Sequence, residues 1–245
     1  MFENVGEVVL LFWRTLLALP QSWRQRHKIF DQFFEIGNAS LLMVCVLSFF
    51  IGAVIALQTG PVLVERSLAS AVGGVVGIAI ATELAPVMMA ILIAGRIGSA
   101  MAAEIGSMRV YQEIDALRTM NINPIHYLVL PRMIAIAIAL PMLVTFSILV
   151  GWFGGAVVAN YNHHMEIPFL AFFSDLKNIV VLQDVGNGVF KSFCFALIIG
   201  SVSCHQGLTT IGGPRGIGRS VTKAVVNSIV FIVIFDYILT RFLLK

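Results

Sequence analysis

Charged side chains are scarce in this sequence of 245 residues: Asp, Glu, Lys and Arg make up 12% of it, about half of their share in ordinary globular domains. Cysteine is scarce too, and Cys45, Cys194 and Cys204 lie in apolar stretches without the spacing of a zinc site or a disulfide framework. Because 58% of the residues are hydrophobic, the composition excludes an ordinary soluble domain. It predicts an integral membrane protein.

The sequence also lacks the motifs of nucleotide hydrolysis and of the common hydrolases. The glycine-rich run 212–219 has no Lys-Ser or Lys-Thr pair and is interpreted as a cytoplasmic loop that precedes the last helix, not as a phosphate-binding loop. Neither G-x-S-x-G nor H-E-x-x-H occurs. The adjacent His163 and His164 are interpreted as a solvated turn, not as a metal site. We therefore expect no enzyme activity, no cofactor and no metal in this chain itself.

Long apolar stretches are abundant. A helix that crosses a bilayer needs about 20 mostly apolar residues, because its backbone groups must be satisfied within the helix. The sequence predicts an all-α fold with five such spans. They are placed near 41–64, 72–102, 130–158, 188–208 and 221–243. The spans are expected to form one bundle over residues 41–243, within a single domain that covers residues 1–245.

Residues 1–30 are predicted to form an amphipathic helix that lies along the inner leaflet. Trp13, Trp23 and the basic run 24–28 suit the headgroup region. The apolar face is expected to consist of Val5, Val8, Val9, Phe12, Leu16 and Leu19. A first membrane span is the alternative, which the charges at Arg14 and in 24–28 disfavour.

The distribution of Lys and Arg sets the expected orientation, because these residues concentrate on the cytoplasmic side. With the N-terminus inside and the C-terminus outside, most of them lie in the cytoplasm. The outer side then carries Arg66, Lys177, Lys191, Arg241 and Lys245. The loop near 160–187 is expected to hold a short helix on the outer surface, with Pro168 in its first turn.

Glu83 is a carboxylate inside the predicted second span, where an ionised group is costly and marks a cavity, a partner or the bundle interior. Pro86 follows three residues later and is expected to kink the helix and loosen nearby carbonyls. The residues alone leave three roles open for Glu83: binding a lipid headgroup, carrying a proton, or pairing within the bundle.

The second span is predicted to continue without a break into an amphipathic segment, 104–120. Val110, Ile114 and Leu117 share one helical face. Pro124 ends the segment, because the residue before a proline avoids the helical region. Such a segment is either a connector that lies on lipid or a ridge on which a protein docks. The G-x-x-x-G pairs Gly73/Gly77 and Gly151/Gly155 indicate close helix packing and are compatible with a dimer.

Many segments of the sequence resemble the MlaE/YrbE family, the permeases of ABC transporters that work with MCE proteins. The matching segments are 50–52, 57–58, 83–87, 94–100, 103–110, 112–117, 123–124, 131–132, 151, 154–155, 191–192, 216–219 and 225–226. The similarity extends over nearly the whole chain beyond about residue 30.

This resemblance implies a homodimeric permease in the bacterial inner membrane. Its implied partners are a cytoplasmic ABC ATPase dimer, which holds the ATP and Mg, a periplasmic hexamer of MCE-domain protein and, in some systems, a STAS-domain subunit. The implied substrate is phospholipid moved between the inner and outer membranes. No nucleic acid is expected among the partners.

The resemblance also implies two sets of functional residues. An outward-facing lipid cavity is expected to include Ile55, Val62, Leu63 and Glu83, with Arg66 either binding a lipid phosphate or pairing with Glu65. Contacts with the ATPase are expected from Glu104, Arg109, Glu113, Asp115 and Arg118. Thr82 stands where some family members have an arginine, so positions 82 and 83 cannot form a local acid–base pair.

Two other functions compete with this interpretation. One is a secondary transporter that uses Glu83 as its proton site, which predicts inverted repeats and discontinuous helices. The other is a membrane anchor for an MCE assembly that transports nothing.

Overall fold

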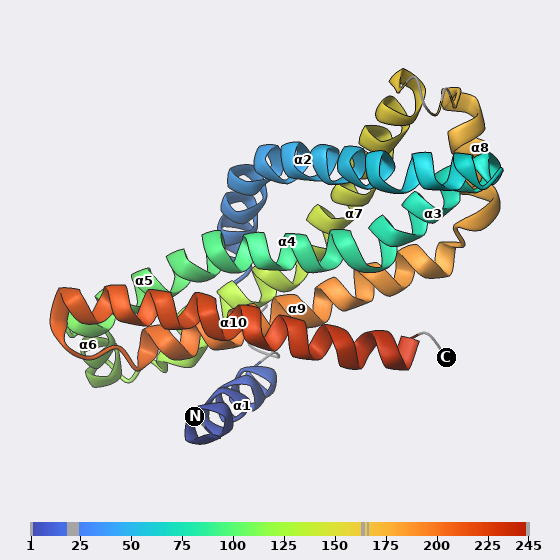
Figure 1. Cartoon of the computed structure of the whole chain (residues 1–245). Coiled ribbons are helices and arrows are strands. Elements are labelled where there is room, and N and C mark those ends of the chain that lie inside the picture. The colour runs from blue at the N-terminus through green and yellow to red at the C-terminus, as the bar shows by residue number, and fades with distance from the viewer. Residues whose placement is uncertain (1, 19–24, 163–164, 166, 244–245) are drawn as a thin grey trace. The chain divides into compact units, whose positions relative to one another are not determined.

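The computed structural model describes residues 2–18, 25–162, 165 and 167–243, and the described secondary structure is helical throughout (Figure 1). Predictions on Leu19, Trp23, Arg24, His163, His164 and Lys245 lie outside these residues. The long elements are α1 (Phe2–Leu17), α2 (Arg26–Glu65), α7 (Leu130–Tyr161), α9 (Leu182–Leu208) and α10 (Gly213–Leu243). The shorter ones are η2 (Ala69–Ala71), α3 (Val72–Ala79), η3 (Ile80–Leu84), α4 (Ala85–Ile93), η4 (Ala94–Gly98), α5 (Ser99–Val110), α6 (Glu113–Thr119), η5 (Ile125–Val129) and α8 (Phe169–Ile179).

The described residues contain five helical stretches that are long and apolar enough to cross a membrane. They are Arg26–Glu65, Ala69–Val110, Ile125–Tyr161, Leu182–Leu208 and Gly213–Leu243. By length and composition, the five predicted spans are confirmed. The last begins before the predicted residue 221, since the run from Gly213 is helical. The loop prediction for 212–219 is therefore wrong from Gly213 onward. Gly212 and Gly213 adopt positive φ values of 94° and 66° where the chain turns into α10, and Pro214 lies in the first turn of that helix.

The second span contains two π-helical turns, η3 and η4. Pro86 follows η3 and has no N–H to donate to the carbonyl of Thr82, four residues earlier. A wider π turn separates the proline ring from that carbonyl and lets the helix continue. The predicted disturbance at Pro86 is therefore a local widening of a continuous helical stretch.

The chain divides into two compact units. The first consists of residues 1–38, 90–140 and 193–245. Within it, α10 packs along α5 and η4 (Figure 1), and the buried residues of α10 form a stripe at four-residue spacing: Gly216, Ser220, Ala224, Ser228 and Ile232. Four of these five residues are small, as is typical of closely packed membrane helices.

α1 belongs to the first unit and is helical, as the sequence predicts. The side of α1 that is buried in protein consists of Leu11 and Thr15, and Ala18 in the turn after α1 is buried as well, while Val9 and Trp13 are exposed. The stripe that contacts protein thus differs from the predicted apolar face. The boundary at residue 30 is also wrong, because α2 begins at Arg26.

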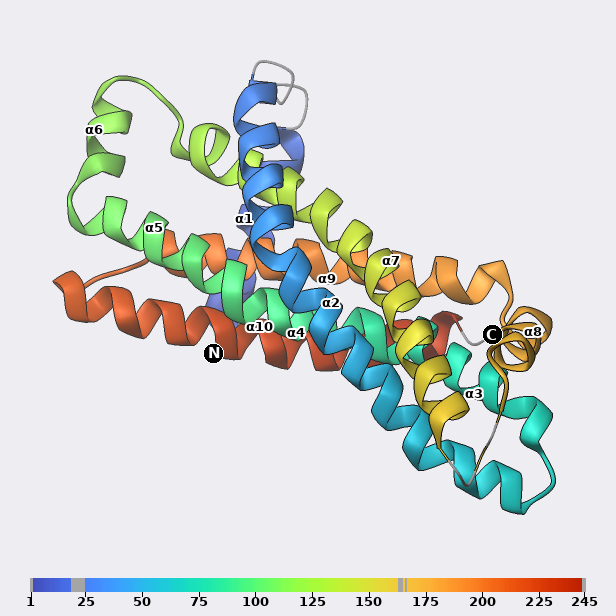
Figure 2. The same cartoon turned by 90° about the horizontal axis from the view of Figure 1, so that it is seen from above.

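The second unit consists of residues 39–89 and 141–192, and glycines bring its helices into backbone contact. A Cβ on Gly52 would overlap the carbonyl of Gly151, and a Cβ on Gly154 would overlap that of Phe49. α8 packs on α3 in the same way, because Gly73 meets the Phe172 carbonyl (Figure 2). Both predicted G-x-x-x-G pairs are therefore in contact with helices of the same chain.

α8 is the short helix predicted between the third and fourth spans. Pro168 precedes it as the N-cap, and Phe172 and Leu176 are buried. Its side on the membrane stays a prediction.

One helix prediction is wrong. The segment 104–120 is broken, because α5 ends at Val110 and α6 begins at Glu113, after Gln112 in the left-handed region with φ 61°. A non-glycine residue there is strained, and packing explains the strain. The turn allows Ile114 to be fully buried in a cluster with Leu11 and Ile105.

Candidate functional site

Glu83 forms an ion pair with Lys191, which lies on α9. The Nζ atom of Lys191 donates a hydrogen bond to Oε1 of Glu83 at 2.8 Å and another to the carbonyl oxygen of Thr82 at 3.1 Å. The side chain of Lys191 is 2% exposed, whereas that of Glu83 is 39% exposed. The lysine is thus enclosed by protein, and the glutamate side chain stays accessible on one side.

The backbone around this pair is adapted to it. Pro86 cannot donate to the Thr82 carbonyl, and the ammonium group of Lys191 supplies a donor to that oxygen. A Cβ on Gly188 would overlap the carbonyl of Ala81, so the absence of a side chain lets α9 approach η3. Gly188 lies three residues before Lys191 and hence on the same side of α9.

The sequence alone misses this partner. It places Lys191 among the cations of the outer side, and with Thr82 next to it, Glu83 has no local basic partner. The structure supplies the base from a helix more than 100 residues later in the chain. One signal in the sequence could have identified this partner. Lys191 directly precedes a long uncharged window, so it is a lone cation in one span, and such a cation can pair with the lone carboxylate of another span.

The other predicted cavity residues lie near the C-terminal end of α2. Ile55 and Leu63 are half-buried, and Val62 is 50% exposed. Arg66 is exposed in the turn after α2, next to Ser67, whose φ is 60°. The structure places these residues and Glu83 in the same unit, the second. That they line one cavity stays a prediction.

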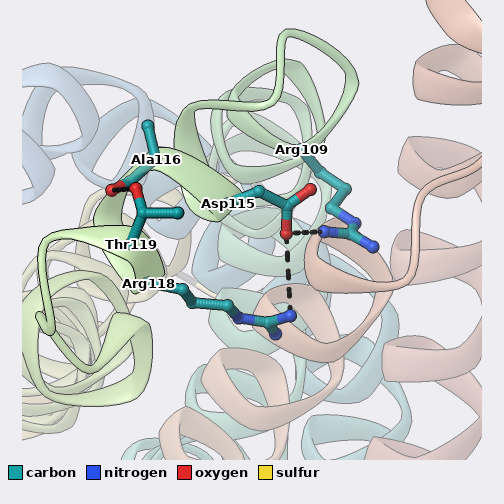
Figure 3. Close-up of polar contacts among 5 residues, drawn as sticks. All are labelled: Arg109, Asp115, Ala116, Arg118 and Thr119. Atoms are coloured by element: carbon teal, nitrogen blue, oxygen red, sulfur yellow. Dashed lines mark hydrogen bonds and ion pairs between the residues drawn. The ribbon is translucent and has the colours of Figure 1, made fainter.

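The predicted coupling residues differ in their partners. Asp115 accepts a hydrogen bond from Arg109 at 2.7 Å and lies 3.6 Å from Arg118 (Figure 3). Glu104 pairs instead with Arg132 of α7 at 2.8 Å. Glu113 is exposed in the first turn of α6. We call Arg109, Glu113, Asp115 and Arg118 the charged α6 surface.

The charged α6 surface lies on a buried hydrophobic base. Ile114 is fully buried, and Leu117 packs against the same cluster of hydrophobic residues from α1, α5, η5, α7 and α9. Asp115 and Arg118 are at least half exposed. Acidic residues in the first turn and a basic residue in the last also complement the helix dipole. The predicted division of α6 into a buried face and a charged face is confirmed.

Comparison with known proteins decides the family. The sequence model described as "Permease MlaE" matches residues 29–242. The chain belongs to the MlaE permease family. It is 36% identical to a probable ABC transporter permease protein of Synechocystis over 98% of this chain and 90% of that protein. It is 38% identical to a probable ABC transporter permease protein of Rickettsia felis over 99% and 93%.

A plant relative is also similar. The chloroplastic protein TRIGALACTOSYLDIACYLGLYCEROL 1 of Arabidopsis thaliana is 35% identical over 97% of this chain and 65% of that protein. This MlaE-family permease is therefore a transmembrane subunit of the ABC transporter class, as the sequence resemblance implied. Within it, the structure brings together Glu83 with Lys191, and Arg109 with Asp115 and Arg118.

Proposed function

We propose that this permease moves phospholipid between the inner and outer membranes of a bacterium, driven by ATP that a separate ABC ATPase dimer hydrolyses with Mg. Two copies of the chain form the permease, and a hexameric MCE-domain protein receives or delivers lipid in the periplasm. A STAS-domain subunit is a further partner of the ATPase. The chain crosses the inner membrane five times, with its N-terminus in the cytoplasm and its C-terminus in the periplasm.

The observation that carries the coupling to an ATPase is the charged α6 surface on its buried base. Paired charges at the surface remain solvated and are accessible to a protein partner. The buried Ile114 anchors α6 in the first unit, so that α6 moves together with that unit. A displacement of α6 by the ATPase would be transmitted directly to α5, with which α6 is in contact. Because α5 and Glu83 belong to one helical stretch, Ala69–Val110, the displacement would be transmitted along this stretch to the region of Glu83.

Different observations support the proposal that the substrate is a lipid. The Arabidopsis relative carries the name of a glycolipid, and the half-exposed apolar residues of α2 offer contacts for acyl chains. Glu83 has an accessible side that can accept a hydrogen bond from a headgroup, with Lys191 holding the carboxylate in place. α1 then lies in the inner leaflet, with exposed apolar side chains such as Val9, Leu10 and Trp13 in lipid.

The alternatives are less well supported. A secondary transporter with a proton site at Glu83 disagrees with membership in an ABC permease family, and the carboxylate already accepts a hydrogen bond from the ammonium group of Lys191. A passive anchor for an MCE assembly does not require a charged surface on a buried base.

Replacing Glu113 and Asp115 by Gln, together with Arg118→Gln, is expected to reduce co-purification of the ATPase by about tenfold or more. Polar contacts at the rim of an interface are weak singly, but three lost contacts and their complementarity add up. The measurement is the ATPase to permease ratio after affinity purification, followed by lipid transfer between vesicles. The charge-matched control replaces Arg215, Asp31 and Glu35 by Gln, which lie outside α6. ATPase recovery and lipid transfer that both survive the triple change would contradict the proposed coupling.

A further inference from the structure

Two open cavities in the first unit are lined by the same three helices, α1, α9 and α10, and one of them also by the loop between α9 and α10. The first has a volume of about 560 Å³ and is mainly polar. Its lining consists of Glu7, His205, Gln206, Thr209, Ile211, Gly212, Gly216, Arg219, Ser220 and Lys223. The second has a volume of about 360 Å³ and is apolar. Its lining consists of Val8, Val9, Phe12, Cys194, Leu197, Ile198, Ser201, Val202, Phe231, Phe235 and Leu239.

The two cavities follow one another along a single groove. On α1, their linings meet between the consecutive residues Glu7 and Val8. On α9, Val202 and His205 are separated by about one helical turn. On α10, Lys223 and Phe231 are separated by about two turns. A short loop joins α9 to α10, and the two helices lie side by side (Figures 1 and 2), so the polar part continues into the apolar part. We call this the α1–α9–α10 groove.

Most of the charged residues in the groove are basic. Arg219 and Lys223 line the polar part and are exposed. Among the described residues that line it, Glu7 is the single acidic one, and its carboxylate faces the buried His205, with Oε2 3.5 Å from Nε2. The polar part therefore carries an excess of positive charge.

One line of residues along α10 shows the same change from polar to apolar side chains. Residues at four-residue spacing share a helical face, and on α10 such a row passes from cationic through polar to aromatic. The row consists of Arg219, Lys223, Asn227, Phe231 and Phe235. Cations at one end and a mostly apolar lining at the other complement an amphiphile with an anionic head and an acyl chain.

We infer that the α1–α9–α10 groove binds one phospholipid with an anionic headgroup. Arg219 and Lys223 contact the phosphate, and an acyl chain occupies the apolar part against Val9, Leu197 and Phe231. A free phosphate leaves the apolar part unused. A zwitterionic lipid such as phosphatidylcholine brings its own ammonium group beside the phosphate, so it leaves the net positive charge of the groove uncompensated. The site lies in the first unit, whereas Glu83 and the predicted transport cavity lie in the second. The inference is therefore independent of the proposed transport function.

The polar part is tested with the double change Arg219→Gln and Lys223→Gln. The purified chain in detergent is titrated with phosphatidylglycerol or phosphatidylcholine, and bound lipid is counted by native mass spectrometry. We expect about a tenfold loss of phosphatidylglycerol affinity, because each cation near an anionic surface contributes several-fold to binding. The charge-matched control is Arg215→Gln with Arg241→Gln. These two residues lie on the same helix and line neither cavity.

The apolar part is tested with Val9→Trp. Val9 is 58% exposed and lines the apolar cavity, so the indole fills the groove without disturbing a packed core. We expect this change to lower phosphatidylglycerol binding as well. Leu17→Trp on the same helix is the control, since Leu17 is 69% exposed and lines neither part of the groove.

Three outcomes would overturn the inference. Equal binding of the two lipids, unaffected by the double change, would identify ordinary surrounding lipid. Displacement of phosphatidylglycerol by millimolar inorganic phosphate, with no effect of Val9→Trp, would identify a phosphate site without an acyl-chain part. An unchanged lipid count together with reduced recovery of a protein subunit would identify the groove as a protein contact.

Discussion

Replacing Glu83 by Leu is expected to lower the unfolding temperature of the chain by on the order of 10 °C. The change leaves the ammonium group of Lys191, 2% exposed, without its carboxylate. Removing one partner of a buried ion pair costs about 3–5 kcal/mol, and each kcal/mol corresponds to about 2–4 °C in a chain of this size. The measurement is thermal unfolding of the purified permease in one detergent.

The reciprocal change, Lys191→Met, is expected to cost less. It takes the ammonium group away from Glu83, but that side chain is 39% exposed and can be solvated. Methionine also keeps most of the length of the lysine side chain. The double variant is expected to recover most of the stability lost in Glu83→Leu, because the buried charge is then gone as well.

This cycle also separates the roles proposed for Glu83. If the double variant is stable but retains less co-purified phospholipid and transfers less of it, the carboxylate acts on lipid. If stability, lipid content and transfer all return together, Glu83 serves to neutralise Lys191. A stability loss for Lys191→Met as large as that for Glu83→Leu would contradict the asymmetry of burial on which the prediction rests.

Gly52→Ala is expected to destabilise the chain by about 3 kcal/mol or more. The new Cβ would overlap the backbone carbonyl of Gly151, and backbone cannot move aside as a flexible side chain can. Overpacking of a tight contact typically costs about 1–3 kcal/mol and occasionally more. The expected readouts are a lower unfolding temperature and reduced recovery of monodisperse protein.

Gly37→Ala is the matched control, because Gly37 lies on the same helix and a Cβ there meets nothing within 4 Å. Alanine has a higher helix propensity than glycine, so this variant is expected to gain about 0.5–1 kcal/mol. Equal effects of the two changes would show that propensity, and not the contact between α2 and α7, determines the result.

The sequence determined the helical segments more accurately than it determined their ends or partners. Apolar length alone located the five spans, since a span must satisfy its own backbone. The break at Gln112 was missed, because nothing local favours a left-handed residue there. It follows from the burial of Ile114 in a cluster with Leu11 and Cys204, which are distant from it in sequence.

The candidate sites show the same division. Glu83 stood out in the sequence because a carboxylate in an apolar segment is rare, and the charged residues of 109–118 stood out by helical spacing. The partner of Glu83 did not, since Lys191 reaches it only where Gly188 lets α9 approach η3. Arg109 likewise reaches Asp115 because the turn at Gln112 brings α6 back beside the end of α5, whereas Arg118 meets Asp115 within α6 itself.

The sequence by itself thus determined that this is a helical membrane protein of the MlaE permease family, because hydropathy and motif order are local properties of the chain. The tertiary structure decided which base neutralises Glu83, which face of α1 contacts protein, and which cations of α10 border an apolar groove. Each of these depends on helices that pack together from distant parts of the sequence, and side-chain periodicity within one helix carries no information about its neighbour.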